Sequence, residues 1–226
     1  MASVSDKTVL DSPRSAASEM PESRTARGEE SPGLAPAVPE GTDKPAGISP
    51  EIFDAALTTF LSGRRLDMRA LASEVGISRA TLYRRAGSRD QLLGEVLWYL
   101  ARIAMARASA AAWELCGRER VIAVIDHFLH DLQRAPTLRQ LIESEPETAL
   151  RILTSKHGRV QGGIVDALAY LIKAEREAGY MDPGLDQKTL AYAIVRIGES
   201  FLYADVIADT EPDVDRAVEV IERLLR

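Results

Sequence analysis

Cysteine is nearly absent from this 226-residue chain, in which Cys116 is the one thiol. A single cysteine excludes an intramolecular disulfide, and no cysteine and histidine cluster has the spacing of zinc ligands. No base is fixed beside Cys116 by any sequence motif, so we interpret it as a buried or incidental thiol and not as a nucleophile or redox sensor. We therefore expect a reducing, cytoplasmic setting, with no metal and no cofactor.

Long apolar runs are also missing, because no stretch of about 18 apolar residues, the length that crosses a membrane, occurs in the sequence. The amino-terminal residues have neither the basic start nor the apolar segment of a secretory signal. Enzyme motifs are missing as well: there is no glycine-rich phosphate loop, no His-Glu-x-x-His and no Gly-x-Ser-x-Gly. We expect no membrane partner and no enzymatic activity.

Aromatic residues are missing from residues 1–49, which hold six of the eleven prolines. A segment of this composition buries too little apolar surface to offset the entropy lost on ordering, so we predict a disordered tail at 1–49. From Ser49 and Pro50 onward, apolar residues recur at helical spacing, and these two residues suit an N-cap and a first helical position. A folded region is predicted to begin near residue 50.

Apolar periodicity and the placing of proline and glycine predict only helices after this point. No run of alternating β-branched residues interrupts the pattern, so the predicted fold class is all-α. Asp67, Ser78 and Ser88 are expected N-caps, the last in a capping box with Gln91. The expected helical ranges are 50–63, 67–76, 80–85, 88–112, 119–134, 136–144, 147–156, 159–178, 186–207 and 213–225.

Residues 68–82 have the pattern of a helix-turn-helix. Such a motif needs a small residue where the helices cross, a residue that tolerates positive φ in the turn, and an apolar anchor on the second helix. Ala72, Gly76 and Leu82 meet these needs. With Leu82 buried, a rotation of about 100° per residue places Ala80 and Arg84 on the opposite, exposed face. This chemistry suits DNA, although an ordinary helical hairpin in a bundle is the alternative.

The net charge of −6 hides a basic segment. Residues 50–107 carry nine arginines and six acidic residues, a balance of +3. Residues 1–49 carry −3, and residues 108–226 carry −6. A basic module beside an acidic body is typical of a small DNA-binding unit.

Three segments together resemble the DNA-binding domain of TetR-type transcriptional regulators: 53–60, 71–84 and 87–93. This resemblance implies a helix-turn-helix DNA-binding domain at 50–95 and a larger helical effector-binding and dimerisation domain at 96–226. Residues 83–98 are further similar to a subgroup typified by the repressor of a quorum-quenching lactonase. That likeness implies a small, largely apolar, amphiphilic effector with an acyl chain or a lactone ring.

The resemblance also implies which residues contact DNA. Base contacts are implied for Arg69, Arg79 and Ala80, and Arg84 lies at a contact position that varies within the family. Phosphate contacts are implied for four other residues nearby. The implied DNA-contacting residues are Asp67, Arg69, Ser78, Arg79, Ala80, Thr81, Tyr83, Arg84, Arg85 and Arg89, of which Thr81, Tyr83, Arg85 and Arg89 bind phosphates.

Two departures from the family pattern affect these expectations. Asp67 stands where Thr or Ser usually caps the second helix, and it brings a negative charge near the DNA backbone. Arg85 and Ala86 replace a His-Phe pair, whose aromatic ring commonly packs between the two domains. The first departure is expected to lower DNA affinity, and the second to alter the coupling of the domains.

The resemblance implies a mechanism as well. A homodimer, formed through the last two helices, binds palindromic double-stranded operator DNA as a repressor, and effector binding in the second domain changes its DNA affinity. The candidate effector contacts are Arg102, Met105, Trp113, Phe128 and Leu132. The candidate dimer contacts are Ala193, Ile197, Phe201, Val218, Ile221 and Leu225.

Core packing within one protomer explains the candidate dimer contacts equally well, and it is the favoured explanation for the candidate effector contacts. The alternative function is an all-α dimeric ligand-binding or protein-interaction module without specific DNA binding.

Overall fold

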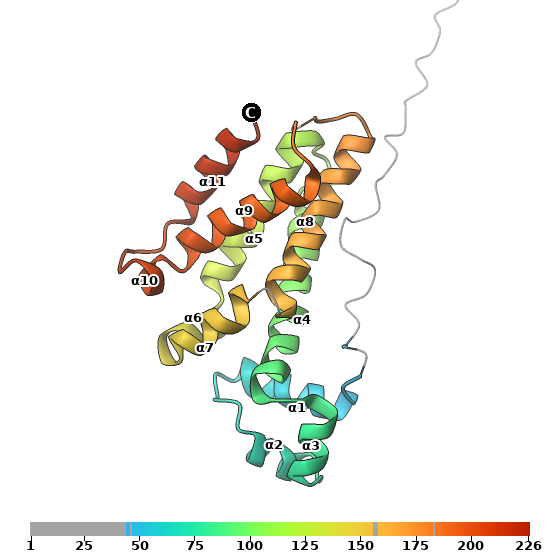
Figure 1. Ribbon diagram of the computed structural model, residues 1–226, viewed down its shortest axis with the longest axis vertical. Coiled ribbons are helices and arrows are strands. Elements are labelled where there is room, and N and C mark those ends of the chain that lie inside the picture. Colours follow the sequence, from blue (N-terminus) through green and yellow to red (C-terminus); the bar gives the residue numbers. More distant parts are fainter. Residues whose placement is uncertain (1–43, 46, 156–157, 183) are drawn as a thin grey trace, which may run out of the picture. The chain divides into compact units, whose positions relative to one another are not determined.

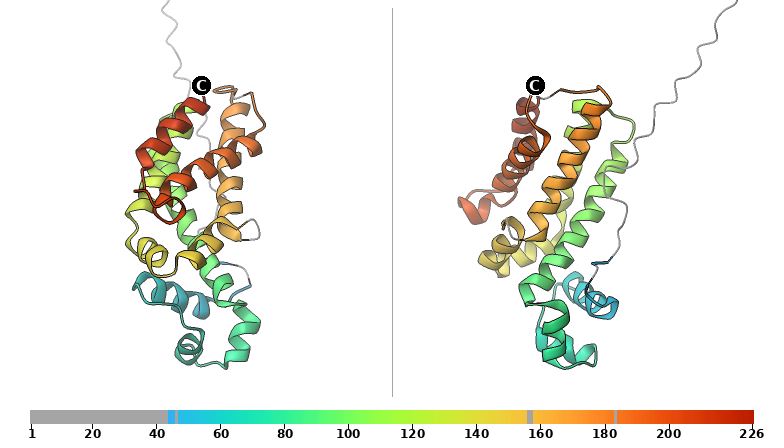
Figure 2. Two further views of the ribbon diagram at one scale, coloured as in Figure 1. Left: turned by 60° about the vertical axis from the view of Figure 1, so that its left-hand side comes forward. Right: turned by 45° about the vertical axis from the view of Figure 1, so that its right-hand side comes forward.

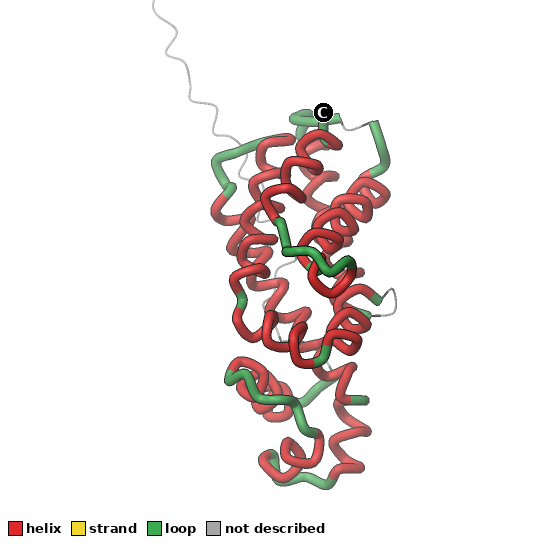
Figure 3. The backbone as a smooth tube through the Cα atoms, turned by 90° about the vertical axis from the view of Figure 1, so that its left-hand side faces the viewer, coloured by secondary structure: helices red, strands yellow, loops and turns green. Residues whose placement is uncertain are grey.

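The computed structural model describes residues 44–45, 47–155, 158–182 and 184–226, and every regular element in these ranges is a helix (Figure 1). The tube in Figure 3 shows the same result, with helices joined by short loops. The all-α prediction is therefore confirmed, whereas the predicted tail lies almost wholly outside the described residues. The helices are α1 (Pro50–Leu61), α2 (Met68–Glu74), α3 (Arg79–Ala86), α4 (Arg89–Ala111), α5 (Gly117–Arg134), α6 (Pro136–Ser144), α7 (Pro146–Thr154), α8 (Arg159–Glu177), α9 (Gln187–Leu202), α10 (Ala204–Ile207) and α11 (Val214–Leu224).

The expected boundaries hold within a few residues, with one exception. The sequence predicts one helix over 186–207, but the structure has α9 and α10 with a break at Tyr203. The Tyr203 backbone leaves the helical region, at φ −109° and ψ 25°, and its side chain is buried. The next turn is tighter, because the Val206 amide donates to the Tyr203 carbonyl, three residues back. Apolar periodicity does not detect such a break, because apolar residues continue on both sides of it.

Helix α2 begins and ends as its sequence predicts. The Asp67 carboxylate accepts hydrogen bonds from the amides of Arg69 and Ala70, at 2.8 and 2.7 Å. The turn after α2 places Gly76 at φ +72°, a conformation that costs glycine nothing. The chain then returns immediately, as the Ile77 amide donates to the Ala72 carbonyl. These contacts set the angle at which α3 leaves α2.

The two following helices begin on serine caps. The Ser78 hydroxyl accepts from the Thr81 amide at 3.1 Å. Ser88 and Gln91 form the expected capping box, in which each side chain accepts from the backbone amide of the other residue. Such caps stabilise a helix start by about 1 kcal/mol each, and they fix the first turns of α3 and α4.

Helices α1 to α3 pack together on the amino-terminal part of α4, seen in Figure 1 as the group around the label α3. Phe53, Leu82 and Leu92 are each fully buried in this group, and Leu71 and Ala72 are nearly so. The apolar anchors predicted for the helix-turn-helix are therefore in the core of this module.

Helix α4 continues for 23 residues, from this module into a bundle with α5, α8, α9 and α11 (Figure 2). The short helices α6 and α7 pack on α5, α4 and α8. Gly163 of α8 allows a close approach to α4, because a Cβ at this position would collide with the ring of Trp98. Glycine at this position is therefore a packing requirement and does not interrupt α8. No helix within the described ranges is both long and apolar enough to cross a membrane.

A buried ion pair holds α5 against the end of α8. The Arg120 guanidinium donates to the Glu175 carboxylate at 2.9 Å, and the Gly117 amide donates to its other oxygen at 2.7 Å. The side chains of Arg120 and Glu175 are 8% and 1% exposed. Removal of either partner would leave an unpaired charge in the core.

Candidate nucleic-acid interface and adjoining cavities

The outer face of α3 and the start of α2 present the side chains that the sequence predicts for DNA contacts. Thr81 is half-buried, and its hydroxyl lies 2.9 Å from that of Ser78. Tyr83 is 51% exposed, which leaves its ring and hydroxyl accessible. The exposed members of this set are Asp67, Arg69, Ser78, Arg79, Ala80, Tyr83, Arg84 and Arg85.

The four arginines of this face have no acidic partner among the described residues. Among the residues that the structure describes, no carboxylate forms an ion pair with Arg69, Arg79, Arg84 or Arg85. Four guanidinium groups without acidic partners on one small face attract a polyanion. We call these four residues the free arginines of the α3 face.

Asp67 is the one carboxylate at the start of α2. The amides of Ala70 and Arg69, which donate to its side chain, hold its pKa below the usual value, with a smaller contribution from the charge of Arg69. Its negative charge is directed to the positive end of the helix dipole and two N–H groups. The Asp67 carboxylate is therefore part of the helix cap.

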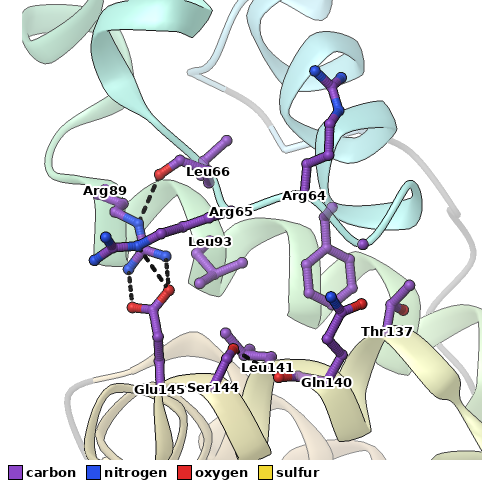
Figure 4. Close-up of a pocket in the computed structure, with 12 residues that line it drawn as sticks. Arg64, Arg65, Leu66, Arg89, Leu93, Thr137, Gln140, Leu141, Ser144 and Glu145 are labelled. Atoms are coloured by element: carbon purple, nitrogen blue, oxygen red, sulfur yellow. Dashed lines mark hydrogen bonds and ion pairs between the residues drawn. The ribbon is translucent and has the colours of Figure 1, made fainter.

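Arg89 is placed differently from the other predicted phosphate contacts. Its guanidinium binds both carboxylate oxygens of Glu145, at 2.6 and 2.9 Å, and its Nε donates to the Leu66 carbonyl at 2.8 Å (Figure 4). The Arg89 side chain is only 20% exposed. Three N–H groups of Arg89 thus donate to protein acceptors, and phosphate binding by this residue stays a prediction that would require these contacts to be shared or broken.

Glu145 connects the α1–α3 module and the start of α4 to the α6–α7 junction. We call its contacts with Arg89 and Arg65 the Glu145 clamp. The Arg65 Nε also donates to Glu145, at 3.1 Å. Glu145 lies between α6 and α7, whereas Arg89 begins α4 and Arg65 and Leu66 belong to the α1–α2 connection. Figure 4 shows the clamp at the edge of a cleft of about 400 Å³, from which Arg64 turns away.

Replacing Glu145 by glutamine tests the clamp. The variant is expected to lower the free energy of unfolding by about 1.5–3 kcal/mol, because charge-assisted hydrogen bonds to two arginines are removed. Urea denaturation followed by circular dichroism measures this change. Glu143→Gln is the matched control, since Glu143 is 66% exposed and lies 3.7 Å from Arg139. An equal decrease in both variants would contradict the clamp.

An apolar cavity of about 330 Å³ lies where the α1–α3 module meets the body, and we call it the wide cavity. Its volume is within the range of about 300–1,000 Å³ typical of small-molecule sites. Phe60 and Leu61 of α1 line it together with residues of α4 to α8. Its lining is Phe60, Leu61, Leu97, Leu100, Ala101, Ile103, Ala104, Arg107, Asp131, Leu132, Ala135, Pro136, Thr137, Leu138, Leu153, Val160, Ile164 and Tyr203.

A second, narrow cavity of about 40 Å³ adjoins the wide one. The two share the lining residues Leu132, Leu153, Val160, Ile164 and Tyr203. Three of the five predicted effector contacts line these cavities: Leu132 lines both, and Met105 and Phe128 line the narrow one.

The other two predicted effector contacts line neither cavity. The Arg102 guanidinium lies over the rings of Trp98 and Tyr99, at 5.9 and 5.8 Å from their centroids. Trp113 follows the end of α4 and is 70% exposed. Arg102 therefore packs against aromatic residues of its own helix, and Trp113 lies beyond the bundle's apolar interior.

The predicted dimer contacts divide into two groups. Ile221 and Leu225 are buried within the protomer, at 0% and 6% exposure, where α11 packs on α5 and α9. We therefore exclude both from a partner surface. The half-buried members of the set are Ala193, Ile197, Phe201 and Val218.

Sequence reasoning missed most of the cavity lining and the clamp. Leu61, Leu153 and Tyr203 come from helices far apart in the chain, and 56 positions separate Arg89 from Glu145. Each of these residues has an ordinary local pattern, so no sequence signal marks it.

Two family models match the chain. The model of the bacterial regulatory proteins of the tetR family matches residues 52–96, and that of the tetracyclin repressor-like C-terminal domain matches residues 116–226. The chain is 29% identical to the TetR-family transcriptional repressor QsdR of R. erythropolis, with a TM-score of 0.68 over 77% of this chain and 92% of that chain. The TetR-family repressor AlkX of Dietzia sp. shares the fold at 24% identity, with a TM-score of 0.56 over 80% of this chain and 97% of that chain. No curated protein sequence matches the chain.

Proposed function

The chain belongs to the TetR family, whose members are ligand-responsive DNA-binding transcription regulators and not enzymes, and we propose how its residues divide this work. Residues 50–95 form the DNA-binding domain, and residues 96–226 form the effector-binding and dimerisation domain. The protein acts as a repressor on a palindromic operator. Because that operator is chromosomal DNA, its place of action is the cytoplasm.

The free arginines of the α3 face carry the DNA-binding part of the proposal. Arg79 and Ala80 at the start of α3, with Arg69 from α2, contact base edges in the major groove. Arg85 contacts phosphates together with the hydroxyls of Thr81 and Tyr83, and Arg84 contacts a variable position. Asp67 and Ser78 act through the helices that they cap. This assignment is supported by the exposure of the four arginines and by their lack of acidic partners among the described residues.

The wide cavity is the proposed effector site. Its lining includes Leu61 of α1 and Leu100 of α4, so a bound effector touches the DNA-binding domain and the body together. The effector is a small amphiphile, largely apolar, with an acyl chain or a lactone ring. A ligand shifts a conformational equilibrium only by its difference in affinity for the two states. A ligand in this cavity binds the two states with different affinity if α1 and α4 move relative to α6 between them, because the shape of the cavity then changes.

The Glu145 clamp is the proposed second link between the domains. It joins the start of α4 to the junction of α6 and α7, and both helices α6 and α7 line the wide cavity. The Arg151 guanidinium donates to Asp90 of α4 at 2.7 Å and adds a parallel connection from α7. Movement of α6 and α7 is therefore transmitted to the first turn of α4.

The dimer proposal keeps the four half-buried residues of α9 and α11: Ala193, Ile197, Phe201 and Val218. Pairing of these helices across a two-fold axis places two α3 helices on one side of the dimer. Half-sites about 34–36 Å apart are the spacing that such a pair reads. Effector binding changes this spacing and releases the operator.

Filling the wide cavity tests the proposed function. Ala104 lines this cavity and is buried, so Ala104→Phe places a ring in the space that the effector would take. We expect the variant to bind the DNA upstream of its own gene ~5–150-fold more weakly than the wild type, the usual range of allosteric coupling. Fluorescence anisotropy measures both affinities.

The control for Ala104→Phe is Ala110→Phe, because Ala110 is exposed on α4 and lines neither cavity. The proposal fails if Ala104→Phe folds, forms the wild-type oligomer and still binds the upstream DNA with wild-type affinity.

A further inference from the structure

The narrow cavity has one charged side chain, that of Glu199, among its lining residues. Glu199 of α9 lines it and is 8% exposed, and Tyr203 lines it and is 4% exposed. The other lining residues are apolar: Met105, Ile125, Phe128, Leu129, Leu132, Leu153, Val160, Ile164, Leu168, Ile194, Val195, Gly198 and Leu202. A carboxylate and a phenol side chain therefore both line a space that is otherwise apolar.

The protein satisfies only part of the capacity of Glu199 to accept hydrogen bonds. Gln161 Nε2 donates to its two oxygens at 2.9 and 2.8 Å, and Arg196 donates to Oε2 at 2.7 Å. An ionised carboxylate has about four acceptor sites, so capacity remains after these contacts. Burial raises the pKa of the Glu199 carboxyl, against the opposing effect of Gln161 and Arg196. An added donor from a ligand would stabilise the charged form further.

Tyr203 is the second polar residue of the narrow cavity, and it also lines the wide cavity. Burial and the neighbouring Glu199 carboxylate raise the pKa of Tyr203, so its hydroxyl stays protonated. The described residues form no hydrogen bond with this hydroxyl. It is available to a ligand as donor or acceptor.

The two cavities differ in size in a way that orients a ligand. The wide cavity, of about 330 Å³, has room for an apolar body. The narrow one, of about 40 Å³, holds a group of only a few atoms. Leu132 and Tyr203 line both cavities, so a molecule in the wide cavity would reach Glu199 by placing a small end group past these shared side chains.

We propose that the effector of this regulator has a neutral head group that donates a hydrogen bond, such as a hydroxyl or a primary amide, to the Glu199 carboxylate beside Tyr203. The inference rests on the proposed function of the wide cavity as effector site. A free carboxylate or phosphate would bring a like charge against Glu199 in a space with little water. An ester of the same length has no N–H or O–H to donate, and neither has a lactone ring by itself. Of the effectors proposed above, the inference therefore selects an acyl chain or lactone that also carries an N–H or O–H group.

Four probes with the same chain separate these head groups: 1-decanol, decanamide, methyl decanoate and decanoate. Isothermal titration at pH 8 measures each against the full-length dimer. We expect 1-decanol and decanamide to bind ~10-fold or more tightly than the methyl ester, the effect of one charge-assisted hydrogen bond. Decanoate is expected to bind more weakly than the ester.

Glu199→Gln identifies the residue responsible for this preference, because glutamine keeps the shape and removes the charge. The variant is expected to bind decanoate about as well as the ester. Tyr203→Phe is expected to weaken 1-decanol binding without improving decanoate binding. Glu177→Gln, at an exposed position of α8, is the control and keeps the wild-type order.

The inference is overturned if wild type binds decanoate as tightly as 1-decanol, if none of the probes binds, or if a folded Glu199→Gln keeps the wild-type order. If Glu199→Gln does not fold, the relative affinities of the wild type for the four probes and the effect of Tyr203→Phe on 1-decanol binding test the inference instead. Anisotropy with the upstream DNA is measured in parallel. Failure of the probes with intact DNA binding overturns this inference alone, whereas absence of specific DNA binding in the wild type overturns the proposed function.

Discussion

Replacing Arg79 by alanine is expected to weaken operator binding by about 2–6 kcal/mol, or ~30-fold to ~20,000-fold, because it removes a base contact of ~1–3 kcal/mol from each protomer of the dimer. Arg79 is exposed at the first position of α3 and has no ion pair among the described residues. Its removal therefore breaks no internal contact. Anisotropy with the upstream DNA and with mutated half-sites measures both affinity and specificity.

The control for Arg79→Ala is Arg85→Ala, at the other end of α3. Removal of a guanidinium that binds phosphate is expected to weaken operator and shuffled DNA to the same degree. It should also reduce the salt slope by ~1 for each phosphate that is no longer neutralised. Retention of wild-type specificity by a folded Arg79→Ala dimer would refute the assignment of base contacts to the start of α3.

Replacing Glu175 by alanine is expected to lower the free energy of unfolding by about 3–5 kcal/mol, because it leaves the Arg120 charge buried without its partner. Arg120 is 8% exposed, and the Gly117 amide is deprived of its acceptor as well. A decrease of this size is a large part of the ~5–15 kcal/mol that stabilises a typical protein. Urea denaturation followed by circular dichroism measures it.

Glu177→Ala is the matched control, two residues farther along α8. The Glu177 side chain is 68% exposed and lies 3.6 Å from Lys173, also an exposed residue. Exposed pairs of this kind contribute about 0–1 kcal/mol, so little change is expected. If Glu175→Ala were as stable as Glu177→Ala, the Arg120 pair would not be what secures α5 to α8.

The sequence predicted those parts of the fold that depend on neighbouring residues. The Asp67 cap, the turn at Gly76 and the Ser88 capping box each need contacts within about four positions, and the structure has all three. Buried positions such as Leu82 follow from helical periodicity in the same way. Local chemistry therefore defines the helix-turn-helix and most helix ends.

Contacts between distant segments were beyond the sequence patterns. The pairing of Arg89 with Glu145 depends on the placement of α6 and α7, which no local pattern predicts. The burial of Ile221 depends in the same way on the packing of α11 against α5 and α9. The break at Tyr203 depends on a side chain buried by tertiary packing. Likewise, the sequence around Glu199 is that of an ordinary charged position on a helix, and only the fold places this side chain in the lining of an apolar cavity.

Specific DNA binding by the α3 face is the central claim. Anisotropy titration of the wild-type protein with the DNA upstream of its own gene, and with the same DNA shuffled, tests it most directly. We predict binding of the upstream DNA ~1,000-fold or more tightly than shuffled DNA, with affinity that falls steeply as salt rises. Equal affinity for the two DNAs at moderate salt would contradict it.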